Sequence, residues 1–197
     1  MRIVRIVSTV VLLCVALACI VSATTYNTWL RRYEQEKTNW CWVACAQMLA
    51  KNQVATTVTQ TEAVIHVKGS DVNEPAESIY EIEDAVKFIS NNAFSTIKGE
   101  VVLQENALKE KMAAGYPVIA GMAVVFGTSG TGHAFVIDRY DDSNRNVRLV
   151  NPWPGSTTRY EYTYDQIACG SGFTLYPYND QNNSTTGLWI RYITRYE

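Results

Sequence analysis

Residues 35–42 of this 197-residue chain read QEKTNWCW, so that a glutamine stands six positions before a Cys-Trp pair. Two shorter motifs follow in order, GHAF at residues 132–135 and NPW at residues 151–153. A cysteine, a histidine and an asparagine, with a glutamine upstream of the cysteine, are the side chains that a thiol acyl-transfer site requires. The chain carries one complete set of them.

The hydrophobic pattern around these motifs changes its period halfway along the chain. Apolar residues recur at i, i+3, i+4, i+7 and i+8 near the first motif, which predicts a helix. The predicted helices cover residues 40–52, 60–67, 78–91 and 104–114. The predicted strands cover residues 118–126, 133–140, 146–151, 157–162 and 187–193, with a glycine-rich loop at residues 127–132. This order favours an α+β fold, in which an N-terminal helical layer packs against a C-terminal antiparallel sheet with the active site between them.

Cys41 lies at the predicted start of the first helix, with Thr38 or Asn39 as the expected N-cap. Unpaired backbone N–H groups and the positive end of the helix dipole favour a thiolate at that place. We therefore predict that Cys41 is the nucleophile. Cys45, one turn further along, is expected to be a buried helix cysteine.

The chain has two histidines, His66 and His133. His66 lies within a predicted helix, with no loop beside it, and is expected to be a surface or partly buried residue. His133 follows the glycine-rich loop and opens a strand, where its side chain can face a cleft. We predict His133 as the general base and acid at the Cys41 sulfur.

Asn151 ends the strand that would pair beside the strand of His133. Its amide oxygen could accept a hydrogen bond from the second ring nitrogen and so fix the plane of the ring. The alternative is ordinary turn chemistry, because Asn-Pro is a common start of a loop. Gln35 is predicted to donate its side-chain N–H to the oxyanion, together with the backbone N–H of Cys41.

Taken together, the three motifs resemble those of the papain superfamily of cysteine peptidases. The resemblance covers about residues 33–165. Within the superfamily, the chain is most similar to the compact bacterial branch, which includes staphopain-like, AvrRpt2-like and bacteriocin-processing peptidases. It implies a papain-like fold in which Trp153 covers the bond between His133 and Asn151 from water. Trp42 matches the Cys-Trp pair of the family. Trp40 stands where papain-type enzymes often carry a small residue, and we expect this larger side chain to narrow the cleft.

The first 23 residues are predicted to be a signal peptide. Arg2 and Arg5 precede an apolar run that ends in small residues at Ala23, and the run is short for the roughly 20 residues of a spanning helix. The expected product is a secreted, extracellular or periplasmic domain of residues 24–197, with no membrane contact once the signal is removed. The alternative is a lipoprotein anchored at Cys19.

Removing Arg2 and Arg5 leaves 15 basic against 19 acidic residues, a net charge of about −4. With no basic patch, a nucleic-acid partner is not expected. Of the cysteines that remain besides the predicted nucleophile, Cys45 and Cys169 could pair or could both be buried free thiols, and we favour the second. A metal site is not expected, because metal-ligand spacing is missing.

The function predicted from these residues is peptide-bond hydrolysis by a thiol peptidase that needs no cofactor. Its partner would be a polypeptide substrate, and a monomer is expected although no motif defines the oligomeric state. Two alternatives stay open. A papain-fold acyltransferase, of the transglutaminase or deamidase kind, would use the same side chains with a different acceptor. A non-catalytic secreted binding module would keep the fold alone.

Overall fold

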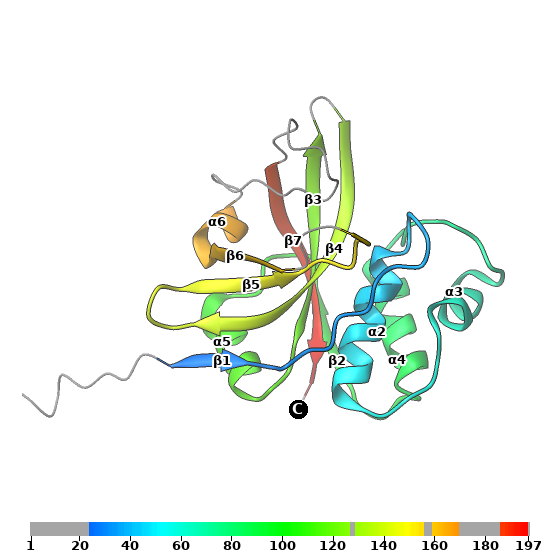
Figure 1. Cartoon of the computed structure of the whole chain (residues 1–197), viewed down its shortest axis with the longest axis horizontal. Helices are drawn as coiled ribbons and strands as arrows, with labels where there is room; N and C mark the ends of the chain where they lie inside the picture. Colours follow the sequence, from blue (N-terminus) through cyan, green and yellow to red (C-terminus); the bar gives the residue numbers. More distant parts are fainter. Residues whose placement is uncertain (1–23, 127–128, 156–158, 170–185, 197) are drawn as a thin grey trace, which may run out of the picture.

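The computed structural model describes residues 24–126, 129–155, 159–169 and 186–196, so the predicted signal peptide lies outside the described residues. A helical layer packs on one side of a strongly curved antiparallel sheet (Figure 1). The helices of this layer come early in the chain, and every strand except β1 comes after them. The predicted α+β architecture is therefore confirmed.

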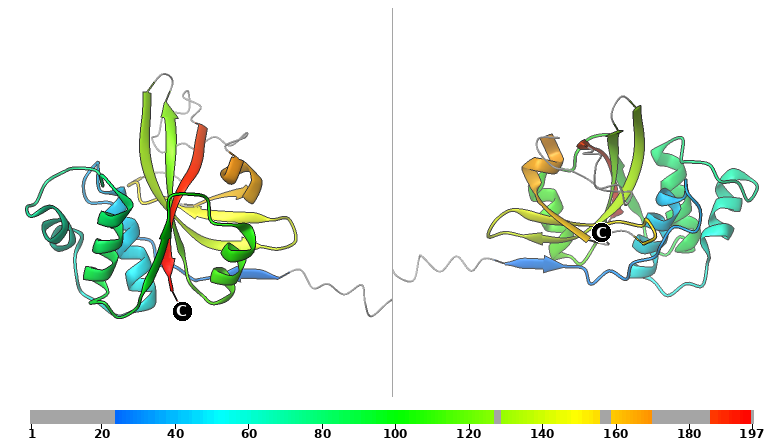
Figure 2. Two further views of the ribbon diagram at one scale, coloured as in Figure 1. Left: turned by 180° about the vertical axis from the view of Figure 1, so that it is seen from behind. Right: turned by 45° about the horizontal axis from the view of Figure 1, so that its top comes forward.

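The helical layer consists of α2 (Cys41–Gln53), α3 (Gln60–Lys68) and α4 (Ile79–Ile89). Two further helices, α5 (Glu105–Ala113) and α6 (Tyr164–Cys169), lie on the other side of the sheet (Figure 2). The strands are β1 (Thr25–Asn27), β2 (Thr96–Gly99), β3 (Val118–Phe126), β4 (Ser129–Asp141), β5 (Asn146–Val150), β6 (Arg159–Thr163) and β7 (Thr186–Arg195). They follow the order β2-β7-β3-β4-β5-β6, with β1 paired to β4, and all neighbours are antiparallel.

The start of α2 differs from the prediction. Its N-cap is Trp40, and no side chain caps the helix. Thr38 and Asn39, the predicted caps, are instead bound to Asn73 in the loop before α4: Asn73 donates to the Thr38 hydroxyl at 2.8 Å, and the Asn39 amide donates to the Asn73 carbonyl at 2.8 Å. The N–H groups of the first turn are therefore not taken up by a capping side chain.

The glycine-rich segment is another correction. Residues 129–132 were predicted as loop, but they extend β4 and pair with β3, from Phe126↔Ser129 to Ala123↔Gly132. Pairing along a hairpin can hold glycines in a strand whose own propensity is low. The short elements β1, β2 and α6 were not predicted, because segments of three to six residues are too short to show a period.

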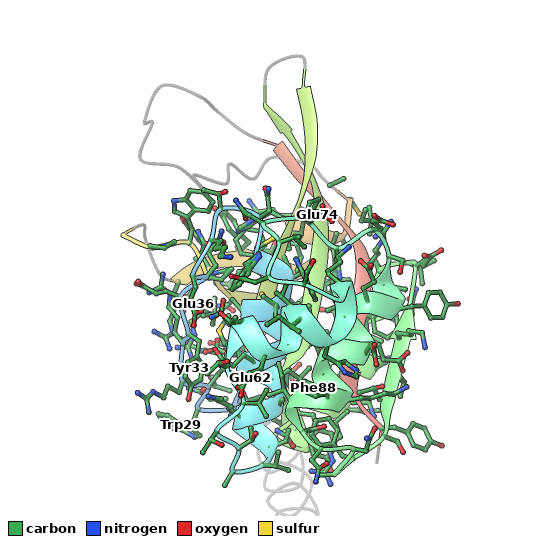
Figure 3. The ribbon with its side chains drawn as sticks, turned by 90° about the vertical axis from the view of Figure 1, so that its right-hand side faces the viewer. Trp29, Tyr33, Glu36, Glu62, Glu74 and Phe88 are labelled. Atoms are coloured by element: carbon green, nitrogen blue, oxygen red, sulfur yellow. The ribbon has the colours of Figure 1, made fainter. Side chains whose placement is uncertain are left out.

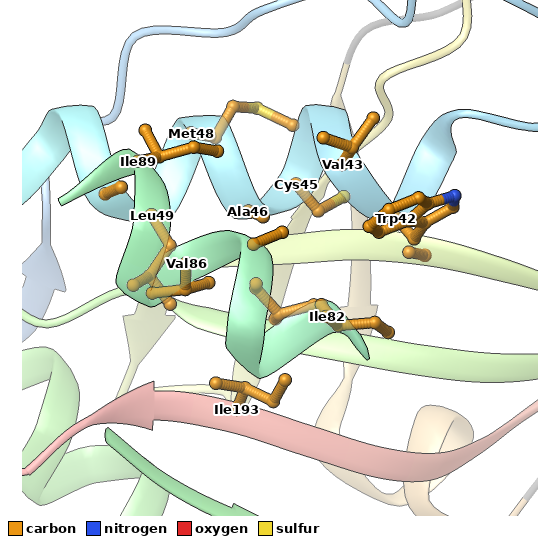
Figure 4. Packing of buried hydrophobic residues seen from close by; sticks show 14 of the residues in the cluster. Trp42, Val43, Cys45, Ala46, Met48, Leu49, Ile82, Val86, Ile89 and Ile193 are labelled. Carbon is orange, nitrogen blue, oxygen red and sulfur yellow. The ribbon is translucent and has the colours of Figure 1, made fainter. Parts of the chain in front are cut away.

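The apolar core divides between the two faces of the sheet. One cluster fills the space between α2, α4 and the sheet, where Leu49, Val86, Ile89 and Ile193 meet with at most 1% exposure (Figure 4). The other packs α5 and α6 against the opposite face. Burying each such side chain stabilises the fold by about 1.5–3 kcal/mol. This packing fixes α2, and with it Cys41, relative to β4.

All three cysteines of the described residues are free thiols. Cys45 is buried as predicted, whereas Cys169 is exposed at the end of α6, contrary to the expectation that both would be buried. In the ranges that the structure describes, no helix is long and apolar enough to cross a membrane.

Candidate active site

Cys41 is the first residue of α2, and the end of the helix that carries it faces β4. The backbone N–H groups of Ala134 and Trp42 favour the charged form of its sulfur. Burial by itself would raise the pKa of the Cys41 thiol, but the charge of His133 and the hydrogen bonds from His133, Ala134 and Trp42 outweigh it, so the pKa is lowered. The environment therefore favours the thiolate.

His133 lies in β4 and is 9% exposed. Its Nε2 is 3.0 Å from Oδ1 of Asn151, which leaves Nδ1 for its hydrogen bond with the Cys41 sulfur. Burial by itself would lower the pKa of His133, but the negative charge and hydrogen bond of Cys41 and the hydrogen bond of Asn151 raise it. The opposite shifts of the two pKa values describe a thiolate–imidazolium pair.

Asn151 directly follows β5 and is fully buried. Its Oδ1 also accepts the backbone N–H of Trp153 at 3.0 Å, so that one amide oxygen joins the turn to the histidine ring. The turn chemistry and the contact to the ring, which the sequence presented as alternatives, are thus both present.

The turn at residues 151–153 is held from the other end of the chain. Arg32 donates from Nε to the carbonyl of Asn151 at 2.6 Å and from Nη2 to the carbonyl of Trp153 at 2.5 Å. The backbone N–H of Gln35 donates to the carbonyl of Pro152 at 2.8 Å. Tyr33 and Glu36 mark this N-terminal segment in Figure 3, where it runs beside α2. The sequence carried no signal for Arg32, because a lone arginine has no spacing pattern.

Gln35 lies beside the start of α2 and is 3% exposed. Its Nε2 donates to the carbonyls of Lys37 and Thr38 at 2.9 and 2.8 Å, and its Oε1 has no partner among the described residues. An oxyanion contact requires one of these N–H groups to turn away from its carbonyl. The role of Gln35 as an oxyanion donor therefore stays a prediction.

A cleft of about 290 Å³ opens at Cys41 and His133, between the helical layer and the sheet. Trp42, Ala76 and Ile82 contribute its helical wall, while β3, β4 and β7 contribute its floor. Most of the lining side chains are apolar.

Trp40 does not line this cleft, so the expectation that it narrows the cleft is wrong. Its side chain is fully buried, and its indole N–H donates to the carbonyl of Val72 at 2.8 Å. The indole of Trp42 donates to the carbonyl of Glu74 at 3.1 Å. Both tryptophans hold the loop at residues 71–77 against α2, and this loop carries Ala76 of the cleft wall.

His66 is exposed on α3, as predicted, where its ring stacks on Phe88 at 4.2 Å and its Nε2 lies 3.5 Å from Asp84. It takes no part in the cleft.

Cys45 lies one turn after Cys41 on α2. Burial raises the pKa of the Cys45 thiol well above its usual range, and the charge of Cys41 adds to this. No three His, Cys, Asp or Glu side chains of the described residues are grouped so that they could hold a metal ion.

A thiolate at a helix start, a histidine that shares a proton with it and an asparagine that orients the ring are the parts of a cysteine peptidase, and the α+β fold is papain-like. The chain belongs to the Peptidase_C39-like family, whose model matches residues 29–183.

Among solved structures, the chain is similar to xylellain, a cysteine protease from Xylella fastidiosa. The two are 14% identical with a TM-score of 0.49, over 84% of this chain and 86% of that one. A comparison with curated proteins finds no match.

Proposed function

We propose that the protein is a secreted peptidase that hydrolyses peptide bonds through an acyl-enzyme on Cys41. The observation that supports it most is the pair of opposite pKa shifts, lowered at Cys41 and raised at His133, inside a cleft open to a ligand. A buried structural cysteine has no need of such a partner, as Cys45 with its raised pKa shows.

The chemistry follows from the two atoms that share a proton. The Cys41 sulfur attacks the carbonyl carbon of the scissile bond, and the C–N bond breaks as His133 gives its proton to the leaving amine. His133 then takes a proton from water, whose oxygen attacks the thioester, and the thiolate leaves. Asn151 keeps the ring plane constant through both steps, because its Oδ1 is fixed by the Trp153 N–H.

Negative charge that develops on the carbonyl oxygen needs donors close to the sulfur. The start of α2 supplies them, because no side chain caps the helix there and its dipole is positive at that end. The backbone N–H of Cys41 is the main donor in this proposal, and Gln35 is the second.

The test is to map covalent adducts of an epoxysuccinyl thiol inhibitor by mass spectrometry, alongside peptide hydrolysis. We expect a single adduct at Cys41 and loss of hydrolysis in Cys41→Ala. Cys169→Ala is the matched control, since Cys169 is an exposed thiol on α6, and it should keep both the adduct and the activity. An intact protein that never reacts, or reacts at Cys169, would contradict the proposal.

The same experiment, run with an added amine nucleophile, distinguishes hydrolysis from acyl transfer. Water as the acceptor predicts cleavage products alone at every amine concentration. A transfer product would assign the site to a papain-fold acyltransferase. A biological effect that survives Cys41→Ser unchanged would instead indicate a binding module.

Export can be tested directly on the cell-free fraction. Removal of the predicted signal yields a mature chain that begins at Thr24, which N-terminal sequencing would detect. A mature chain that begins at a lipid-modified Cys19 would overturn the secreted form in favour of the anchored one.

A further inference from the structure

Three residues from adjacent strands form a row across the floor of the cleft. Arg191 of β7 pairs with Gly121 of β3, and Gly121 pairs with Ala134 of β4. Ala134 lines the cleft together with Cys41 and directly follows His133, so the row ends beside the nucleophile. Neighbouring strands lie about 4.8 Å apart, which places the backbone of Arg191 about 10 Å from that of Ala134.

Gly121 gives the Arg191 side chain a path across this row. A Cβ atom at position 121 would lie 3.2 Å from Cβ of Arg191 and 3.8 Å from its Cγ and Cδ. The aliphatic stem of Arg191 therefore rests on the bare backbone of Gly121, on the floor that both residues contribute to the cleft. A larger residue at position 121 would push the stem aside.

The charge of Arg191 has no counterpart in the part of the chain that the structure describes, where no hydrogen bond or ion pair reaches its guanidinium. Every other described arginine contacts a carboxylate, an amide or carbonyl oxygen, or an aromatic ring: Arg31, Arg32, Arg139, Arg145, Arg148, Arg159 and Arg195. Arg191 is partly buried, and the described lining of the cleft contains no carboxylate. A guanidinium stays charged at any physiological pH, so such a site favours an anionic ligand.

We propose that Arg191 binds a carboxylate of the peptide substrate and so makes the peptidase select an acidic group near the scissile bond. The proposal rests on the proposed peptidase function. An extended peptide advances about 3.3 Å per residue, so the roughly 10 Å between Ala134 and Arg191 correspond to about three residues. The carboxylate belongs to an Asp or Glu side chain within that distance or to the C-terminus of a short substrate.

The experiment uses fluorogenic peptides that carry Glu, Gln or Lys at each position within three residues of the scissile bond, each as free acid and as C-terminal amide. At one position we expect Glu to exceed Gln by roughly tenfold or more in kcat/KM, the range of a hydrogen-bonded charge. Arg191→Gln should remove this preference, and Arg191→Glu should turn it towards Lys. Arg31→Gln removes a charge on the exposed surface, beside Tyr33, and is the matched control that keeps the preference.

Amidated peptides identify the source of the carboxylate. A preference that persists after amidation assigns Arg191 to an acidic side chain, and one that vanishes assigns it to the terminal carboxylate. Equal rates for Glu and Gln at all positions in the free-acid and amidated series, or a preference that survives in Arg191→Gln, would overturn the proposal.

Binding separates this proposal from the peptidase function itself. The Cys41→Ala variant should bind the Glu peptide roughly tenfold or more tightly than the Gln peptide, and the additional change Arg191→Gln should abolish that difference. If the Cys41→Ala variant binds tightly and selects the charge but the unaltered protein hydrolyses no peptide, the proposed peptidase function is contradicted and the role of Arg191 is supported. Equal binding would remove the role of Arg191 whether or not the protein hydrolyses peptides.

Discussion

Arg32 donates a hydrogen bond of 2.6 Å to the carbonyl oxygen of Asn151, a residue 119 positions later in the chain. The side chain of the same Asn151 contacts His133, so the N-terminal segment helps to position the His133 ring through Asn151. Two bonds from one planar guanidinium, to Asn151 and to Trp153, fix both ends of the turn.

Replacing Arg32 should therefore impair the orientation of His133 without touching the substrate. For Arg32→Ala we expect kcat to fall by on the order of tenfold, the size of one or two lost charge-assisted hydrogen bonds, with KM nearly unchanged. Arg32→Lys should recover only part of the loss, since an ammonium cannot span both carbonyls. Arg31→Ala is the control, and an Arg32→Ala variant with unaltered kcat would show that the turn holds itself.

Asn151 should control the alkaline limb of the pH–rate profile. Activity requires the ion pair, so it should rise as pH increases through the lowered pKa of Cys41 and fall as pH increases through the raised pKa of His133. The hydrogen bond from Asn151 contributes to raising the pKa of His133. Asn151→Ala should shift the alkaline limb to lower pH, and Asn151→Asp should shift it to higher pH because it adds a negative charge. Profiles of kcat/KM that coincide for the three proteins would contradict this.

Gln35 decides between two forms of the oxyanion site. If its amide turns towards the substrate during the reaction, Gln35→Ala should lower kcat by about 10²–10³ with little change in KM. The structure has both of its N–H contacts on the carbonyls of Lys37 and Thr38, so a loss of only a few-fold would leave the backbone donors of α2 to act alone. A thermal melt of the variant separates this effect from unfolding.

The loop at residues 71–77 should affect substrate binding more than chemistry. Asn73 accepts the Asn39 N–H at 3.0 Å and donates to the Thr38 hydroxyl, which holds the loop on the segment before α2. Asn73→Ala should loosen the cleft wall, raising KM several-fold while kcat changes less, because Cys41 and His133 stay in place. Steady-state kinetics would measure this, with Asn92→Ala, in the turn after α4, as the control. A rise in KM no larger than in the control would mean that the wall does not need this anchor.

Local patterns were sufficient for much of the fold. The four predicted helices agree with α2, α3, α4 and α5 to within two residues at each end, because each carries apolar residues at helical spacing that bury against the sheet or, for α3, against α2 and α4. The strands were recognisable wherever five or more residues suited a buried sheet. The short elements β1, β2 and α6 depend on partners from elsewhere in the chain. So does the glycine-containing start of β4 at residues 129–132, which is a strand because it pairs with β3.

The choice of Cys41, His133 and Asn151 as candidate residues also came from the linear order of short motifs, since the chemistry of a thiolate demands those residue types. Their meeting in space, the arginine that supports Asn151 and the row from Arg191 to Ala134 were decided by tertiary structure alone. The strand order β7-β3-β4 brings residues 191, 121 and 134 together, although 57 and 70 positions separate Arg191 from the others. Contacts of this kind come from packing, which depends on all the elements at once, and no local pattern records them.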